Sequence, residues 1–203
     1  RHVAECKAAI AASTYKNVEV IVVDEGKERS YQRNFGMNKA QGKYLLILDS
    51  DMMVTPYVIE NCVMLMELYK YIVAMYIPEH IVTPGWFGRL RNWERQFYNG
   101  TLVDCVRFIR RDMPNFPLFD ETLHGVEDSD WERRIIGVKA TCSYPVNHHD
   151  KCGVVSYLKK KKYYAQCLGK YKAKHPNDKL LTFKYRCFDV YVQNGKWKRL
   201  LQK

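Results

Sequence analysis

The sequence lacks a paired-cysteine motif, a signal peptide and an unbroken apolar run long enough to cross a membrane. Its seven cysteines are an odd number, lie far apart and include no Cys-x-x-Cys pair. They are therefore expected to be buried, reduced thiols in a cytosolic protein, not a disulfide framework. Glu67 and Lys70 interrupt the most apolar long stretch, residues 62–77, so no transmembrane helix is predicted. We expect a cytoplasmic protein, with peripheral attachment to a membrane as the open alternative.

Acidic residues are fewer than basic residues. The chain has 33 Lys and Arg against 22 Asp and Glu, a net charge of +11, which indicates a polyanionic partner, an anionic membrane surface or a phosphorylated substrate. A basic amphipathic helix is predicted over residues 156–174, and it either lies on an anionic bilayer or covers the core of its own domain. We divide the 203 residues into a main domain, 1–153, and a basic C-terminal extension, 154–203.

Two short apolar runs, residues 18–23 and 44–48, each end in carboxylates. The acids that follow them are Asp24, Glu25, Asp49 and Asp51. Such runs indicate strands buried on both faces, and an open α/β sheet binds its ligands beyond the carboxyl ends of its strands. Because Thr55 and Pro56 already supply a helix start, the second acid pair is not needed as a cap. This pair predicts a divalent cation site, with an ordinary surface turn as the alternative.

The predicted elements alternate between helices and strands. Helices over residues 4–12 and 30–41, the second one capped by Ser30, precede the two apolar strands, and this order predicts a parallel sheet covered by helices. A helix over 56–69 and strands over 72–77, 104–111 and 139–144 follow. Residues 78–100 are predicted as a loop, in which Trp93 and several arginines suit a sugar or phosphate surface, with a partly buried surface excursion as the alternative. A hairpin with an Asn194-Gly195 turn is predicted near the C-terminus.

A second group of acids follows Gly125 at a predicted helix start. It consists of Glu127, Asp128 and Asp130. Acids in a first helical turn are favoured by the helix macrodipole, but three of them exceed what capping needs. The paired histidines His148 and His149 are candidate metal ligands. The lesser alternative is a zinc site built from Cys142, His148, His149 and Cys152.

Taken together, these segments resemble the nucleotide-sugar-dependent inverting glycosyltransferases of the GT-A fold, often called family 2. Residues 18–26 are similar to the family's second strand, where an acid reads the nucleotide base. Residues 33–36 and 40–44 match its Arg-Asn-x-Gly helix and the start of the next strand. Residues 49–51 match its Asp-x-Asp motif, which contacts ribose and a metal that bridges the diphosphate. Residues 125–131 resemble its Glu-Asp motif, which carries the catalytic base.

The resemblance implies an α/β fold with a mostly parallel, Rossmann-like sheet in the catalytic domain, and Mg²⁺ or Mn²⁺ as the cofactor. It implies Asp128 as the catalytic base. The expected donor-binding residues are Asp24, Glu25, Arg33 and Asp49. The expected metal ligands are Asp51 and one of His148 and His149. The expected acceptor-side residues are Trp93, Glu127, Asp130 and Trp131. The partners would be a nucleotide-sugar donor and a saccharide, lipid-linked or protein acceptor, with peripheral membrane contact as an option and no nucleic acid.

The family's first strand, which lies between the strands at 18–23 and 44–48, has no counterpart in this sequence. The chain also begins at Arg1, inside a predicted helix, so we expect a fragment or a processed form. Unpaired strand edges are costly, and we expect the chain alone to be poorly stable and to bind nucleotide weakly. Two rival functions remain open: a nucleotidyltransferase of similar fold, and a non-enzymatic basic module that binds membrane or nucleic acid through residues 159–174.

Overall fold

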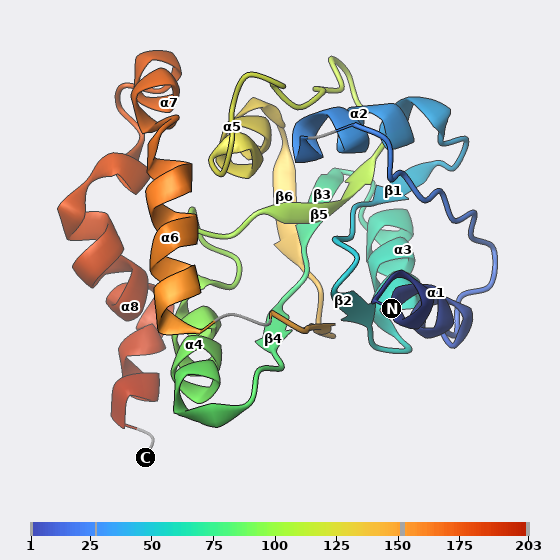
Figure 1. Cartoon of the computed structure of the whole chain (residues 1–203). Coiled ribbons are helices and arrows are strands. Elements are labelled where there is room, and N and C mark those ends of the chain that lie inside the picture. Colours follow the sequence, from blue (N-terminus) through green and yellow to red (C-terminus); the bar gives the residue numbers. More distant parts are fainter. Residues whose placement is uncertain (1, 27, 151–152, 202–203) are drawn as a thin grey trace.

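Two small β-sheets form the centre of the structure, a computed structural model that describes residues 2–26, 28–150 and 153–201 (Figure 1). The larger sheet has the strand order β1-β5-β3-β6 and the smaller one the order β2-β7-β4. The strands are β1 (Tyr44–Leu46), β2 (Met52–Val54), β3 (Ile72–Tyr76), β4 (Glu79–Ile81), β5 (Val106–Arg110), β6 (Val138–Thr141) and β7 (Val146–His148). The α/β class predicted from the sequence is confirmed.

The larger sheet is mixed, whereas a mostly parallel sheet was predicted. β5 runs antiparallel to both of its neighbours, with Ile109 opposite Leu45 on β1 and opposite Ala74 on β3. β3 and β6 are parallel, with Met75 opposite Ala140. The reason is that β4 and helix α4 (Gly85–Tyr98) lie between β3 and β5 in the sequence and return the chain in the opposite direction.

Helices cover both faces of the larger sheet (Figure 1). Besides α4, the helices of the described residues are α1 (His2–Ala11), α2 (Arg29–Lys39), α3 (Val58–Leu68), α5 (Glu127–Arg134), α6 (Val154–Ala165), α7 (Leu168–Lys174) and α8 (Val190–Val192). On one face Ile109 packs with Met37 of α2 and Trp131 of α5. On the other face Phe108 packs with Cys62 and Met66 of α3. Neighbouring residues of β5 thus enter opposite cores, as the period of a strand requires.

The C-terminal segment packs against the rest of the chain along α4 and α5 (Figure 1). Tyr171, Tyr185 and Val190 are buried in this contact. Lys196 Nζ donates to the carbonyl oxygens of Phe97 (2.7 Å) and Asn99 (3.0 Å) at the end of α4. None of the described helices combines the length and the apolar character needed to span a bilayer.

The run 18–23, predicted as a strand, belongs to neither sheet of the described residues. Within the part of the chain that the structure describes, β1 is the edge strand of the larger sheet and is hydrogen-bonded to a strand on one side only, β5. Glu19 anchors the run by accepting the backbone N–H groups of Gln41 (2.6 Å) and Gly42 (2.8 Å). A strand needs a hydrogen-bonded neighbour, and local sequence preference cannot supply one.

Several further predictions about elements were wrong. Residues 78–100, predicted as a loop, form β4 and α4, and the helix predicted over 156–174 is divided at Gln166 and Cys167 into α6 and α7. The predicted C-terminal hairpin is instead α8 followed by a 3₁₀ segment, Gln193–Leu201. Its Asn194 and Gly195 do take the positive φ of a tight turn, 55° and 73°, but helical residues flank them.

Both predicted helix caps lie elsewhere. Thr55 donates its hydroxyl to the Pro145 carbonyl oxygen (2.9 Å), and α3 begins three residues later at Val58. Ser30 lies inside α2, whose N-cap is Glu28. Because Thr55 serves a distant loop, the turn that contains Asp49 and Asp51 is fixed by tertiary contacts as well as by the start of α3.

Candidate active site

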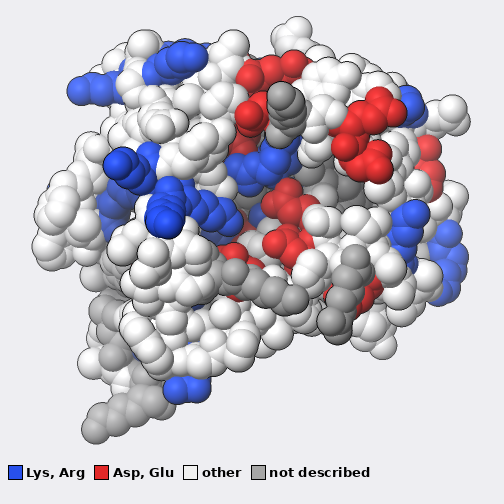
Figure 2. All heavy atoms as spheres, in the orientation of Figure 1, with Lys and Arg blue, Asp and Glu red and all other residues white. Residues whose placement is uncertain are grey.

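A cleft of about 1480 Å³ extends from the run 18–24 on one side to α6 on the other. The loop between β1 and β2, which carries Asp49 and Asp51, lines it between these two walls. Figure 2 shows this hollow, with acidic side chains in its centre and basic side chains above them and on the α6 side. The cleft therefore combines acidic and basic groups in one solvent-accessible space.

Arg33, on α2, connects the two acid groups found in the sequence. Its Nη1 donates to Asp128 Oδ1 at 2.5 Å and its Nη2 to Asp49 Oδ1 at 3.0 Å. The guanidinium lies over the Phe119 ring at 5.1 Å, and the next residue, Asn34, holds the Phe119 backbone through both its amide N–H group and its carbonyl oxygen. The side chain of Arg33 is 8% exposed, so this bridge is well shielded from water.

The charges around this bridge are strongly coupled. Burial alone would raise the pKa of Asp49, but Arg33 and Arg107 together lower that pKa to about 2. Burial and the adjacent Asp128 raise the pKa of Glu127, whose side chain is 2% exposed and pairs with Arg29 at 2.6 Å. Asp128 is 32% exposed and lines the cleft. Of the two neighbouring acids, Asp128 is therefore the one that a ligand can reach.

Asp51, His148 and Glu79 form a chain of polar contacts that leads from the cleft into the interior. His148 Nε2 lies 3.6 Å from Asp51 Oδ2, and His148 Nδ1 lies 3.2 Å from Glu79 Oε2. Burial opposes the charged imidazolium, but the contacts with Asp51 and Glu79 raise the pKa of His148 to about 9. A buried carboxylate that orients the second ring nitrogen is the usual support for a metal-ligating histidine.

The residues at this position fit a divalent cation in the chemistry of their donors. Asp51 offers a carboxylate to the cleft and His148 a ring nitrogen, and Mn²⁺ accepts both donor types, while Mg²⁺ prefers oxygen. Within residues 2–26, 28–150 and 153–201, no group of three His, Cys, Asp or Glu side chains is placed to hold a metal. A cation held here would thus draw further ligands from a substrate or from water. Cys152, part of the alternative zinc site, lies outside the described residues.

Half of the predicted site residues line the cleft. They are Asp24, Arg33, Asp49, Asp51, Asp128 and His148. Glu25 is exposed and lies beside the cleft-lining Asp24. His149 contacts the site through its backbone, since its N–H donates to the Asp51 carbonyl oxygen at 2.9 Å. The geometry therefore brings His148, and not the His149 ring, next to Asp51.

The four predicted acceptor-side residues lie away from the surface of the cleft. Glu127 is buried beneath Asp128, as described above. Trp131 is 1% exposed, stacks on Phe119 at 4.4 Å and donates its indole N–H to the Pro117 carbonyl oxygen at 2.7 Å. Asp130 is fully buried, in ion pairs that include Lys174 and His175. Trp93, on α4, packs edge-on against Phe97 at 4.9 Å.

Several residues at the site were not identified from the sequence. Arg29 and Arg107 stand among the acids, and Tyr164 of α6 closes one side. The Tyr164 ring lies directly against Gly125, where an added Cβ would come within 2.1 Å of it and where φ is +77°. Tyr157 and Tyr164 are two helical turns apart, so a helical period in the sequence does place them on one face.

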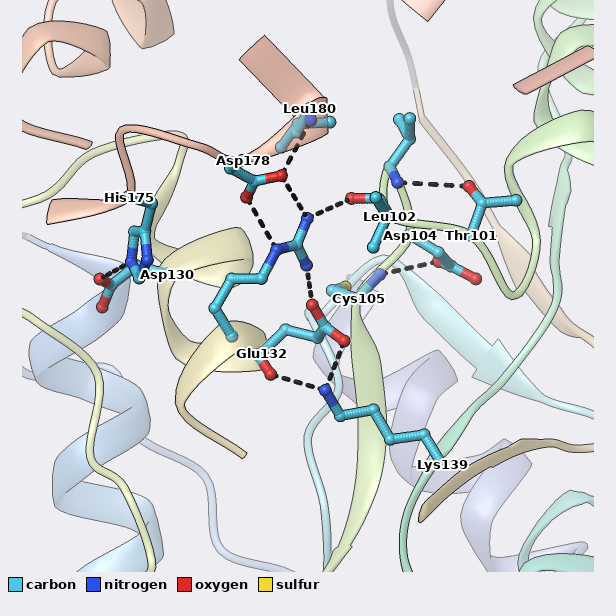
Figure 3. Close-up of polar contacts among 12 residues, drawn as sticks. Thr101, Leu102, Asp104, Cys105, Asp130, Glu132, Lys139, His175, Asp178 and Leu180 are labelled. Atoms are coloured by element: carbon cyan, nitrogen blue, oxygen red, sulfur yellow. Dashed lines mark hydrogen bonds and ion pairs between the residues drawn. The ribbon is translucent and has the colours of Figure 1, made fainter. Parts of the chain in front are cut away.

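Below the site, α5 is fastened to the C-terminal segment (Figure 3). Asp178 accepts from Arg133 Nε at 2.8 Å and from the Leu180 N–H at 2.8 Å, and the Tyr171 hydroxyl also donates to it. Glu132 accepts from Lys139 Nζ at 2.7 Å on the side of the sheet. The helix that begins with Glu127 and Asp128 is thus held from two directions.

Comparisons with known proteins give one family and two structures. The family model described as glycosyl transferase family 2 matches residues 3–163. A crystal structure of S. aureus TarS is similar at 14% identity and a TM-score of 0.51, over 82% of this chain and 37% of that chain. A crystal structure of S. aureus TarS 1-349 is similar at 12% identity and a TM-score of 0.50, over 100% of this chain and 74% of that chain. At these identities the likeness shows the fold alone. No curated protein matches.

Proposed function

Because the chain belongs to glycosyl transferase family 2, we propose that it transfers a sugar from a nucleotide-diphosphate sugar to an acceptor hydroxyl, with inversion at the anomeric carbon. The observation that carries the proposal is the Asp49–Arg33–Asp128 bridge, which joins the Asp-x-Asp segment and the Glu-Asp segment across 79 positions of sequence inside one cleft. The bridge supports the proposal because these two segments would supply the donor half and the acceptor half of the reaction.

The donor half comprises Asp24, Arg33, Asp49, Asp51 and His148. Asp51 and His148 would hold Mg²⁺ or Mn²⁺, which when bound would neutralise the diphosphate as it becomes the leaving group. Asp49, which contacts Arg33 and lines the same cleft as the run 18–24, would contact the ribose of the donor. Asp24, at the end of that run, would contact the base. Glu25 and His149 would support these residues from outside the cleft.

Asp128 is the proposed base. Its Oδ1 accepts from Arg33, and no described residue bonds to its Oδ2, which leaves that oxygen to take the proton of the acceptor hydroxyl. Proton transfer of this kind contributes on the order of 10²- to 10⁴-fold in rate. Attack from the side of Asp128, opposite the departing diphosphate, inverts the anomeric carbon. Glu127 is less suited to the role, because its side chain is 2% exposed and is not among the described residues that line the cleft.

Two substitutions separate the two halves. We expect Asp128→Asn to keep nucleoside diphosphate binding in the presence of Mn²⁺ and to reduce sugar transfer or donor hydrolysis by roughly 10²- to 10⁴-fold. We expect Asp51→Asn to lose the Mn²⁺-dependent part of nucleotide affinity. Asp112→Asn, at an exposed acid, is the matched control. Titration calorimetry with UDP, GDP and dTDP, and detection of released nucleoside diphosphate, provide the measurements.

Each outcome has a clear meaning. Turnover by Asp128→Asn at the wild-type rate would contradict the assignment of the base. Release of pyrophosphate in place of nucleoside diphosphate would favour the nucleotidyltransferase. Nucleotide affinity that does not depend on metal, in wild type and in Asp51→Asn alike, would remove the cation from the proposal.

A further inference from the structure

We propose that the acceptor carries a phosphate group and that Lys160 and Lys161 of α6 bind it at the wall of the cleft. The proposal rests on the glycosyl transfer proposed above and adds the chemical class of the acceptor. Both lysines line the same cleft as Asp51 and Asp128.

Two tyrosine rings hold the lysines against this wall. Lys161 Nζ lies 5.2 Å from the centre of the Tyr157 ring, and Lys160 Nζ lies 5.9 Å from the centre of the Tyr164 ring. Each ring also contacts an arginine from another helix, Arg91 at 4.4 Å on Tyr157 and Arg29 at 5.4 Å on Tyr164. Contacts between cations and aromatic faces are attractive, so the rings fix the positions of both ammonium groups.

The two lysines differ from the arginines beside them in forming no ion pair with a described residue. Arg29 pairs with Glu127 at 2.6 Å and Arg91 with Asp150 at 3.3 Å. No carboxylate of the described residues lies within ion-pair distance of Lys160 or Lys161. Burial and the nearby cations Arg186 and Arg91 lower the pKa of Lys161 by more than the carboxylate of Glu94 raises it. An anion bound at this wall would relieve that repulsion, since a phosphate accepts charge-assisted hydrogen bonds from ammonium groups.

The position of α6 favours the acceptor over the donor as the source of the phosphate. Tyr164 packs on Gly125, three residues before Asp128, so the basic wall adjoins the proposed base. The run 18–24, which would receive the nucleotide, lies on the opposite side of the molecule from α6 in Figure 1. A phosphate at the lysines would therefore belong to the molecule that Asp128 deprotonates.

α6 carries a second pair of lysines with the same charge, and this pair allows binding to a membrane surface to be distinguished from binding in the cleft. All four lysines at 159–162 are exposed, but only Lys160 and Lys161 line the cleft, so we call Lys159 and Lys162 the outer pair. A membrane would reach these outer lysines first, whereas a phosphate in the cleft would reach the inner pair, Lys160 and Lys161. The orientation of the inner pair favours a phosphate on a discrete acceptor.

The test uses the full chain and short-chain polyphosphate as the probe, at about 150 mM salt to suppress long-range attraction. We expect Lys160→Gln with Lys161→Gln to weaken polyphosphate binding at least about tenfold, the factor expected when a charge-assisted hydrogen bond is lost. Lys159→Gln with Lys162→Gln, which removes the same charge, should change the affinity less than about twofold. Neither pair should change nucleoside diphosphate affinity with Mn²⁺. Melting temperatures would confirm that both variants fold.

Three results would overturn the proposal. An equal loss for the inner and outer pairs would indicate non-specific attraction to the helix. A loss of nucleoside diphosphate affinity in the inner pair by the same factor would assign the lysines to the donor. Binding to vesicles with anionic lipid that depends on the outer pair, with no effect of the inner pair on polyphosphate, would indicate a membrane surface. Failure of the proposed glycosyl transfer would instead be seen with Asp51→Asn and Asp128→Asn, which leave the lysines intact.

Discussion

Asp178, in the C-terminal segment, contacts Arg133 on α5, the helix that carries the proposed base. We predict that this contact contributes measurably to the stability of the fold. The change Asp178→Asn keeps the shape of the side chain and removes its charge. The Asp178 side chain is 5% exposed and accepts from Arg133, Tyr171 and the Leu180 backbone. Hydrogen bonds to charged groups contribute about 1.5–3 kcal/mol, and little screening by water applies at this burial. We therefore expect a loss of about 2–3 kcal/mol in the free energy of unfolding.

The loss should depend on pH in a defined direction. Burial would raise the pKa of Asp178, but the hydrogen bonds from Arg133 and Tyr171 outweigh it, and the folded pKa is lowered. A lowered carboxyl pKa contributes stability that is fully present above the unfolded value, about 3.9, and that is lost as the pH falls through the folded value. The difference between wild type and Asp178→Asn should be constant from pH 7 to about pH 5 and should shrink below about pH 4.

Urea unfolding followed by circular dichroism at a series of pH values measures this difference. The matched control is Asp189→Asn, because Asp189 pairs with Lys184 at 2.5 Å in the same segment but their side chains are 34% and 78% exposed. An exposed pair of this kind contributes about 0–1 kcal/mol. Equal effects of the two substitutions at pH 7, or a difference for Asp178→Asn that persists unchanged to pH 3, would refute the reasoning.

Two further substitutions test the packing around the acid helix. Trp131→Ala should lower the free energy of unfolding by about 3–5 kcal/mol, because it empties a core position stacked on Phe119. Thermal unfolding measures this loss. A loss well below that range would show that Trp131 is not a core residue. Gly125→Ala should destabilise the fold by roughly 1–2 kcal/mol from its left-handed backbone alone, with an added cost from the Tyr164 ring. Combining Gly125→Ala with Tyr164→Ala should remove the cost of the contact with the ring and leave the cost of the left-handed backbone. A double-mutant cycle without a coupling energy would show that the two residues do not touch.

The sequence predicted well those features that depend on neighbouring residues. The acids after the 44–48 run and those after Gly125 stand where an apolar segment ends or a helix begins, and both positions are local. The strands over 72–77 and 104–111 are confirmed as β3 and β5, because their apolar content is continuous or alternating over the length of a strand. The resemblance to the glycosyltransferase family rests on these local patterns and is confirmed by the family match over residues 3–163.

Other features depend on contacts between distant residues. The partner of Arg33 lies 95 positions away at Asp128, and nothing in the local pattern of α2 selects it. Trp131 follows Asp128 in the same short motif, yet its side chain is 1% exposed, because it stacks on Phe119 and donates to the Pro117 carbonyl oxygen, both outside the helix. The run 18–23 has the composition of a strand but no strand beside it in the described residues. The arginine and tryptophan residues of α4 were interpreted as typical of a loop, although the segment forms an amphipathic helix.

The bridge through Arg33 has a thermodynamic consequence. One guanidinium contacts Asp49 at the proposed donor end and Asp128 at the proposed acceptor end, so the two ends share a single cation. A donor that changes the strength of the contact between Asp49 and Arg33 also changes the strength of the contact between Arg33 and Asp128. By linkage, an acceptor that engages Asp128 must then change donor affinity by the same factor. The degree of cooperativity between the two substrates is therefore a property that a single side chain can set.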